Sequence, residues 1–261
     1  MLTNRLAVAA GGLSRHFRDS LKIAHELGVD GVEIDGRRGL SADEMSRSGL
    51  RQIRKWLEDY GLGVSAVTFP TRRGYGDPDA LEARITSTKS AMQMAYDLGA
   101  RLLSLHVGEI PVSDESAEWK LLLEVLSDLG SWGDRVGTTI AVEAGRSDPE
   151  DLSRLFDALP AGSLACDLST GLLVVHRHDP VEAIRELGRS VAYVHATDAI
   201  AGPIAGRGRA VVLGTGQVDF AEILGCLEEQ AYHGWLSLEA VEPVAARREI
   251  ENAAAFLRSI G

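Results

Sequence analysis

Short apolar runs and amphipathic stretches alternate along the chain. One unit, an amphipathic stretch, a glycine turn and an apolar run, is clear in "IAHELGVDGVEID" (23–35) and returns in "MAYDLGARLLSLHVG" (94–108) and "LEEQAYHGWLSLEAV" (227–241). The apolar runs are too continuous for strands with one solvated face, so they predict parallel strands buried on both faces. Each turn glycine falls near the end of a predicted helix, where a left-handed residue is favoured.

Counting these runs predicts the architecture. Eight strands are expected near residues 5–10, 31–35, 63–68, 101–106, 138–143, 163–167, 191–195 and 235–240. Helical periodicity predicts helices near residues 14–27, 43–60, 79–98, 116–130, 148–158, 179–188, 218–230 and 245–259. Eight β/α units in 261 residues predict an α/β fold, a closed (β/α)₈ TIM barrel. An open doubly wound sheet is disfavoured because no G-x-G-x-x-G loop follows the first run, and residues 1–261 are interpreted as one domain.

Composition narrows the class of protein. Hydrophobic residues make up 45% and charged residues 25%, as in soluble globular proteins. No apolar stretch reaches the roughly 18 residues that span a bilayer, and the N-terminal segment lacks the basic region of a signal peptide. Two cysteines are too few for a disulfide framework, so a cytoplasmic protein with no membrane partner is expected. The net charge of −11 and the lack of a basic stripe disfavour nucleic acid as a partner.

Polar residues close the apolar runs, and in such barrels the active site collects at the carboxyl ends of the strands. The last four runs end, in order, with Glu143, Asp167, His195 and Glu239. Three clustered carboxylates would repel one another unless a cation lies between them. Carboxylate oxygens with one imidazole suit Mn²⁺, Mg²⁺, Co²⁺ or Zn²⁺. These four residues are therefore predicted to hold one divalent metal ion.

Several further residues are candidates for substrate binding, each with a structural alternative. His106, at the end of the run 101–106, is either a donor to substrate or a packed imidazole. Glu33 either contacts the substrate or bonds neighbouring loops. Arg207 and Arg209 follow the seventh run and either bind a phosphate or an oxyanion or remain solvated.

The motifs resemble the xylose isomerase-like TIM barrel superfamily, in the branch of sugar-phosphate isomerases and epimerases. The resemblance spans nearly the whole chain and is strongest in "VAYVHATD" (191–198) and "LGTGQVDFAEILGCLEEQAYHGWLSLE" (213–239). "LGVDGVEID" and "LLSLHVGE" are also similar to the family's second and fourth strand motifs. The resemblance implies the same four metal ligands as the strand ends do, and His106 matches a position that often touches substrate.

The resemblance also implies an acid–base pair, with Glu143 and Glu239 on opposite faces of the bound sugar. One departure concerns the sixth strand, where many relatives carry Asp-x-x-His and this chain carries Asp167-Leu168-Ser169-Thr170. Thr170 can hydrogen-bond a substrate hydroxyl, but it cannot relay a proton at neutral pH.

The resulting expectation is an enzyme of carbohydrate metabolism, a metal-dependent isomerase or epimerase of a sugar, sugar phosphate or keto-acid. It would transfer a proton through a metal-bound enediolate. Two alternatives stay open. A metal-dependent lyase or dehydratase would eliminate from a keto-sugar or cyclic keto-acid, which the missing sixth-strand histidine favours. A non-catalytic binding module would lack a complete ligand set. The expected partner is a small-molecule substrate, and homo-oligomers are common among such barrels.

Overall fold

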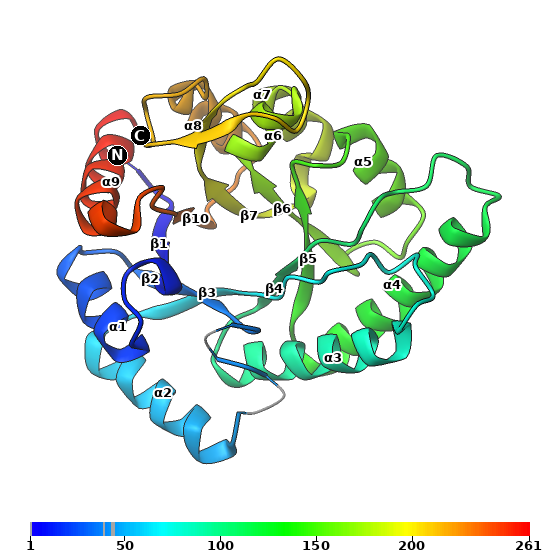
Figure 1. Ribbon diagram of the computed structural model, residues 1–261, viewed down its shortest axis with the longest axis horizontal. Coiled ribbons are helices and arrows are strands. Elements are labelled where there is room, and N and C mark those ends of the chain that lie inside the picture. The colour runs from blue at the N-terminus through cyan, green and yellow to red at the C-terminus, as the bar shows by residue number, and fades with distance from the viewer. Residues whose placement is uncertain (1, 39, 43–44) are drawn as a thin grey trace.

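Eight parallel strands form a closed barrel in the computed structural model, which describes residues 2–38, 40–42 and 45–261 (Figure 1). Around the barrel the order is β1-β10-β7-β6-β5-β4-β3-β2, so β10 closes the sheet against β1. The barrel strands are β1 (Arg5–Ala9), β2 (Gly31–Asp35), β3 (Gly63–Thr68), β4 (Leu102–Leu105), β5 (Thr139–Ala144), β6 (Leu164–Ser169), β7 (Val191–Ala196) and β10 (Trp235–Leu238). The predicted (β/α)₈ fold is confirmed.

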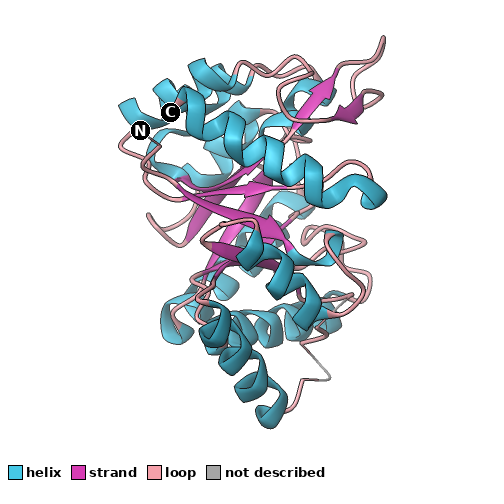
Figure 2. Cartoon of the chain, turned by 90° about the vertical axis from the view of Figure 1, so that its left-hand side faces the viewer, coloured by secondary structure: helices cyan, strands magenta, loops and turns pink. Residues whose placement is uncertain are grey.

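Helices surround this barrel, as the two orthogonal views show (Figures 1 and 2). They are α1 (Phe17–Glu26), α2 (Arg47–Tyr60), α3 (Leu81–Asp97), α4 (Ala117–Val136), α5 (Pro149–Asp157), α6 (Thr170–His176), α7 (Pro180–Leu187), α8 (Phe220–Glu229) and α9 (Ala246–Ile260). Short 3₁₀ turns lie at Ala10–Gly12, Gly188–Ser190 and Pro243–Ala245. None of the helices in the described ranges combines the length and apolarity needed to cross a membrane.

The predicted elements match the observed ones closely. Each predicted strand is present, with ends that agree to within two residues. Helices α5 and α7 begin as their sequences indicate, because Asp148 and Asp179 accept hydrogen bonds from the first turn and proline occupies the first helical position. Helix α4 extends six residues beyond its predicted end at residue 130. Positions 43 and 44 of the helix predicted at 43–60 lie outside the described residues.

One helix and one two-stranded hairpin were not predicted. Helix α6 follows β6 without an intervening turn, and its sequence, TGLLVVH, shows little alternation between apolar and polar positions. The strands β8 (Asp198–Ile200) and β9 (Arg209–Val211) form an antiparallel hairpin outside the barrel sheet. Their linking segment is rich in glycine and carries no strand periodicity.

The amino-terminal end of the barrel is filled by an indole ring. A Cβ on Gly31 would lie 2.7 Å from Cη2 of Trp235, and a Cβ on Gly63 would lie 3.5 Å from the same atom. The ring is buried in a cluster with Tyr193, and the guanidinium carbon of Arg5 lies 4.0 Å from its centroid. With this end occupied, the carboxyl end is where a cavity can open.

Candidate active site

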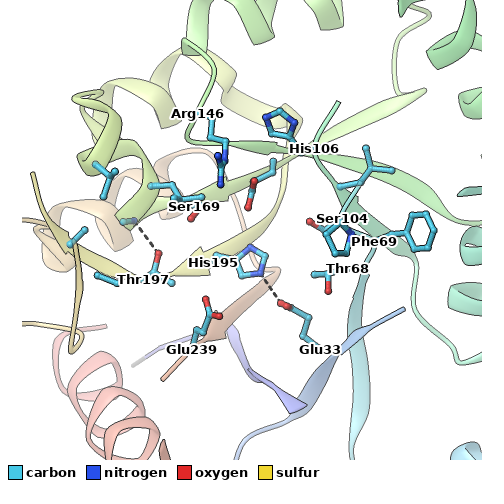
Figure 3. Close-up of a pocket in the computed structure, with 18 of the residues that line it drawn as sticks. Glu33, Thr68, Phe69, Ser104, His106, Arg146, Ser169, His195, Thr197 and Glu239 are labelled. Carbon is cyan, nitrogen blue, oxygen red and sulfur yellow. Dashed lines mark hydrogen bonds and ion pairs between the residues drawn. The ribbon is translucent and has the colours of Figure 1, made fainter. Parts of the chain in front are cut away.

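A cavity of about 760 Å³ lies at the carboxyl ends of the barrel strands (Figure 3). A second cavity of about 510 Å³ shares Glu33, Thr68 and Glu239 with it and extends toward the loop between β1 and α1. The charged and hydroxyl-bearing residues that line the first cavity are Glu33, Thr68, Thr71, Arg72, Ser104, His106, Glu143, Arg146, Ser169, His195, Thr197, Asp198 and Glu239.

His195, near the end of β7, is bound by a carboxylate on each side of its ring. Its Nδ1 lies 2.8 Å from Oδ1 of Asp167, and its Nε2 lies 2.8 Å from Oε2 of Glu33. Asp167 is fully buried and also accepts a hydrogen bond from Ser104. Burial lowers the pKa of His195, but the charges of Asp167 and Glu33 outweigh it and raise the pKa well above its usual value.

Glu33, on β2, lies at the centre of a buried hydrogen-bond network. Its Oε2 accepts hydrogen bonds from the hydroxyls of Tyr193 and Ser237, each at 2.8 Å. The Tyr193 hydroxyl is in turn 2.8 Å from Oγ of Ser65. Burial raises the pKa of Glu33, but the charge of His195 and these hydrogen bonds outweigh it, so the pKa is lowered overall. Glu33 thus lines the cavity and also bonds its neighbours.

Glu143 and Glu239 differ from these fixed carboxylates. Both line the cavity, and neither side chain forms a hydrogen bond or ion pair with any residue in the described ranges. Burial and the charge of Asp167 raise the pKa of Glu143, while burial and the charge of Glu33 raise the pKa of Glu239. Carboxyl groups with raised pKa values are suited to accept and return protons near neutral pH.

The structure does not show an assembled metal centre, because no three His, Cys, Asp or Glu side chains of the described residues surround one coordinating position. The donor set nevertheless fits a divalent ion in kind. Asp167 and His195 lie in contact and offer a carboxylate oxygen and an imidazole nitrogen, the donor types that such ions bind. Glu143 and Glu239, whose side chains have no bonding partner in the part of the chain that the structure describes, offer the remaining carboxylate oxygens.

Three of the predicted substrate-binding residues lie away from the cavity lining. Thr170 is fully buried, and its hydroxyl donates to the carbonyl oxygen of Thr197 at 2.6 Å. Arg207 and Arg209 are on or beside β9, but the hairpin contributes Gly208 and Ala210 to the cavity. Arg207, just before β9, and Arg209, its first residue, are both exposed and do not line the cavity.

His106 does line the cavity, and so do residues that the sequence did not single out. The backbone N–H of Gly108 donates to Nδ1 of His106 at 2.9 Å. Arg146, Ser169 and Thr197 join the same lining (Figure 3). The only sequence signal for Arg146 is its place three residues after Glu143, in the loop that leaves β5.

Asp198, the last residue of "VAYVHATD", links the end of β7 to the Gly-x-Gly loop. Its buried carboxylate accepts four backbone N–H groups at 2.7–3.2 Å, those of Ala199, Gly214, Gly216 and Val218. These bonds tie the loop that precedes α8 to the end of β7. Asp198 therefore has a structural role at the edge of the cavity.

Comparison with known proteins finds relatives of this chain and solved structures with the same barrel fold. A family model described as "Xylose isomerase-like TIM barrel" matches residues 21–260. The chain is 26% identical to an inosose dehydratase of Clostridium botulinum (strain Alaska E43 / Type E3), covering 87% of this chain and 86% of that one. Two solved structures share the fold. A xylose isomerase domain protein from Planctomyces limnophilus aligns with TM-score 0.86 at 22% identity, over 98% of this chain and 96% of that chain. A D-psicose 3-epimerase with D-tagatose, from Clostridium cellulolyticum H10, aligns with TM-score 0.82 at 14% identity. The alignment covers 98% of this chain and 99% of that chain.

Proposed function

The chain belongs to the xylose isomerase-like TIM barrel family, and from this premise we propose that it is an isomerase or epimerase acting beside the carbonyl of a keto-sugar or related polyhydroxy ketone. The observation that carries the proposal is the pair of unpartnered cavity carboxylates, Glu143 and Glu239, beside the tightly held His195. A proton bound to carbon beside a carbonyl is the weakly acidic group that such a pair can move.

The two carboxylates divide the proton transfer between them. One, ionised, removes the proton from the carbon next to the carbonyl. The other, protonated, returns a proton, either to the opposite face of the same carbon or to the neighbouring carbon. The raised pKa values of Glu143 and Glu239 support this division, because each carboxyl group takes up a proton more readily than an ordinary glutamate does.

We propose that Glu143, Asp167, His195 and Glu239 bind one divalent ion of the Mn²⁺, Mg²⁺, Co²⁺ or Zn²⁺ class. Such an ion, when bound, polarises a carbonyl oxygen and makes the neighbouring C–H more acidic. Glu33 supports the site by holding Nε2 of His195, which turns Nδ1 toward Asp167. A carboxylate on the far nitrogen of a ligating histidine fixes the orientation of the ring.

Hydrogen exchange tests the proposal directly. The protein, supplied with Mn²⁺, is incubated with D-fructose or D-tagatose in D₂O, and ¹H NMR follows deuterium at the carbons beside the carbonyl. Glu143→Gln and Glu239→Gln should each lower the exchange rate by roughly 10²–10⁴-fold. Glu242→Gln, the same change at an exposed position three residues after Glu239, should leave it within twofold. Equal exchange by all three variants would contradict the assignment.

Dehydration is the second candidate, because the chain is similar over 87% of its length to a protein named inosose dehydratase. The same base would remove the proton, and the second carboxyl group would protonate a departing hydroxyl. Inosose should then lose one water, which mass spectrometry detects. A product of unchanged composition that carries deuterium instead supports isomerisation or epimerisation.

A further inference from the structure

One side of the cavity carries hydrogen-bond donors where the rest carries carboxylates. Arg72, His106 and Arg146 come from the ends of three consecutive barrel strands, β3, β4 and β5. Figure 3 shows Arg146 and His106 on the same side of the cavity. Within the described residues, Arg146 forms no ion pair or hydrogen bond, and its guanidinium is not within 4.0 Å of the Glu143 carboxylate.

The hydrogen-bonding state of His106 follows from its backbone contact. Because the N–H of Gly108 donates to Nδ1, a neutral ring must carry its proton on Nε2. Burial and the charge of Arg146 lower the pKa of His106, which keeps the ring neutral. The Nε2–H group has no acceptor among the described residues, so it is free to donate into the cavity.

The loop that carries Arg146 is closely packed. A Cβ on Gly145 would lie 2.6 Å from Cβ of Leu172, so the backbone after β5 runs directly against α6. Two residues after Arg146, Asp148 caps α5, because its carboxylate accepts a hydrogen bond from the backbone N–H of Glu150 at 3.0 Å. Arg146 therefore extends from a short segment that is held at both ends.

We propose that the substrate carries an anionic group, a carboxylate or a phosphate, that binds between Arg146 and His106 with Arg72 at the rim. The inference rests on the proposed function for the place of the reacting carbon. The net charge of the chain is −11, and the rest of the lining carries the carboxylates Glu33, Glu143 and Glu239 beside His195, so an anionic group is best placed near the guanidinium groups. The guanidinium of Arg146, which forms no ion pair within the described ranges, supplies a positive charge and the paired N–H donors that planar anions require.

Binding of matched ligands tests this subsite without requiring turnover. The probes are D-fructose, 2-keto-D-gluconate, which has a carboxylate where D-fructose has its C1 hydroxymethyl group, and D-fructose 6-phosphate. In calorimetric titrations of the purified full-length chain, at least one anion should bind about tenfold or more tightly than D-fructose. The anion that gains affinity identifies the group, a carboxylate beside the ketone or a phosphate at the far end.

Variants separate the subsite from general charge and from chelation of a bound ion. Arg146→Gln should abolish the advantage of the anion and leave D-fructose affinity within twofold, and Arg146→Lys should restore part of it. Arg207→Gln removes the same charge from the hairpin outside the cavity lining and should have no such effect. The subsite is overturned if neither anion binds more tightly than D-fructose. It is equally overturned if Arg146→Gln weakens all three ligands alike or if Arg207→Gln matches it.

The proposed function fails in a different way. Deuterium exchange into D-fructose without any preference for anions removes the subsite and leaves the proton transfer in place. Anion binding that depends on Arg146, with no exchange in any of the three ligands, supports the subsite and argues against the proton transfer.

Discussion

At the scale of single residues, the carboxylates of this cavity fall into two groups with different tasks. Asp167 and Glu33 are buried, and each would be costly to bury as an isolated charge. They share His195 between them, and Glu33 also accepts from Tyr193 and Ser237. Glu33 therefore acts as a positioning residue through His195, whereas the unpartnered carboxylates are available for chemistry.

Glu33→Gln removes one partner of a buried, hydrogen-bonded ion pair. The imidazolium of His195 then keeps only Asp167 as its counter-charge, and unfolding should become easier by about 3–5 kcal/mol. Urea denaturation measures the loss. Glu115→Gln is the matched control, because it breaks an ion pair with Lys120 at a side chain that is 90% exposed, and it should cost less than about 1 kcal/mol. Similar small losses in both variants would show that Glu33 makes no important charge interaction.

Glu143→Gln should stabilise the metal-free protein at neutral pH. The pKa of Glu143 is raised on folding, so the folded state binds this proton more tightly than the unfolded state. The stability that the protonated Glu143 contributes to the folded state is fully present below the ordinary pKa of 4.5. It is lost as pH rises through the pKa of the folded state. Glutamine does not ionise, so the Tm of the variant should exceed that of the wild type at pH 8, by about 2–4 °C per kcal/mol, and equal it near pH 4.

Thermal unfolding in EDTA between pH 4 and pH 8 measures the difference in Tm between Glu143→Gln and the wild type. Glu242→Gln, at an exposed position, should follow the wild-type curve throughout. A Glu143→Gln protein that melts below the wild type at pH 8 would mean that the carboxylate has a stabilising partner in the folded state.

At the scale of elements, the loop before α8 depends on Asp198 and on the absence of a side chain at residue 216. A Cβ on Gly216 would overlap the Asp198 carboxylate and lie 2.6 Å from the carbonyl oxygen of Ala199. Gly216→Ala should therefore lower the free energy of unfolding by about 1–3 kcal/mol, as overpacking does. Gly225→Ala meets no atom within 4 Å inside α8 and should instead raise it by about 0.4–1 kcal/mol. Urea midpoints that shift in the same direction would contradict this account.

Helices and strands could be predicted from the sequence wherever burial produces a regular spacing of apolar residues. Parallel strands buried on both faces give continuous apolar runs, and all eight were found. The turns were less regular. Gly28 and Gly99 adopt the expected left-handed conformation, but in the third unit this role falls to Ala231, with φ of 56°, and not to Gly234. Helix α6 and the β8–β9 hairpin gave no periodic signal, and in the structure α6 packs mainly against β8.

At the scale of the whole molecule, barrel closure explains which site residues could be predicted. Residues that end neighbouring parallel strands must meet at one rim, so Glu143, His195 and Glu239 share a cavity. Asp167 does not line that cavity, but its buried carboxylate contacts His195. Residues beyond the strand ends follow no such rule. Their direction depends on the segment that follows each strand. Thr170 begins α6 and its hydroxyl bonds the carbonyl of Thr197, Arg207 and Arg209 belong to the exposed hairpin, and Arg146 lies in the loop after β5 that lines the cavity.

Metal binding is the prediction that tests the assembled rim as a unit. An ion that binds only the folded chain stabilises it by mass action, by about 2.7 kcal/mol at a hundred times its Kd. Addition of Mn²⁺ to chelator-treated protein should therefore raise the Tm by about 5–10 °C, and elemental analysis should find about one ion per chain. Asp167→Asn should abolish both effects. Asp148→Asn makes the same change outside the cavity, where asparagine can still cap α5, so it should keep the increase in Tm with Mn²⁺. If none of Mn²⁺, Mg²⁺, Co²⁺ or Zn²⁺ shifts the wild-type Tm, the four rim residues do not act together as metal ligands. The ion pairs of His195 with Asp167 and Glu33 are then structural.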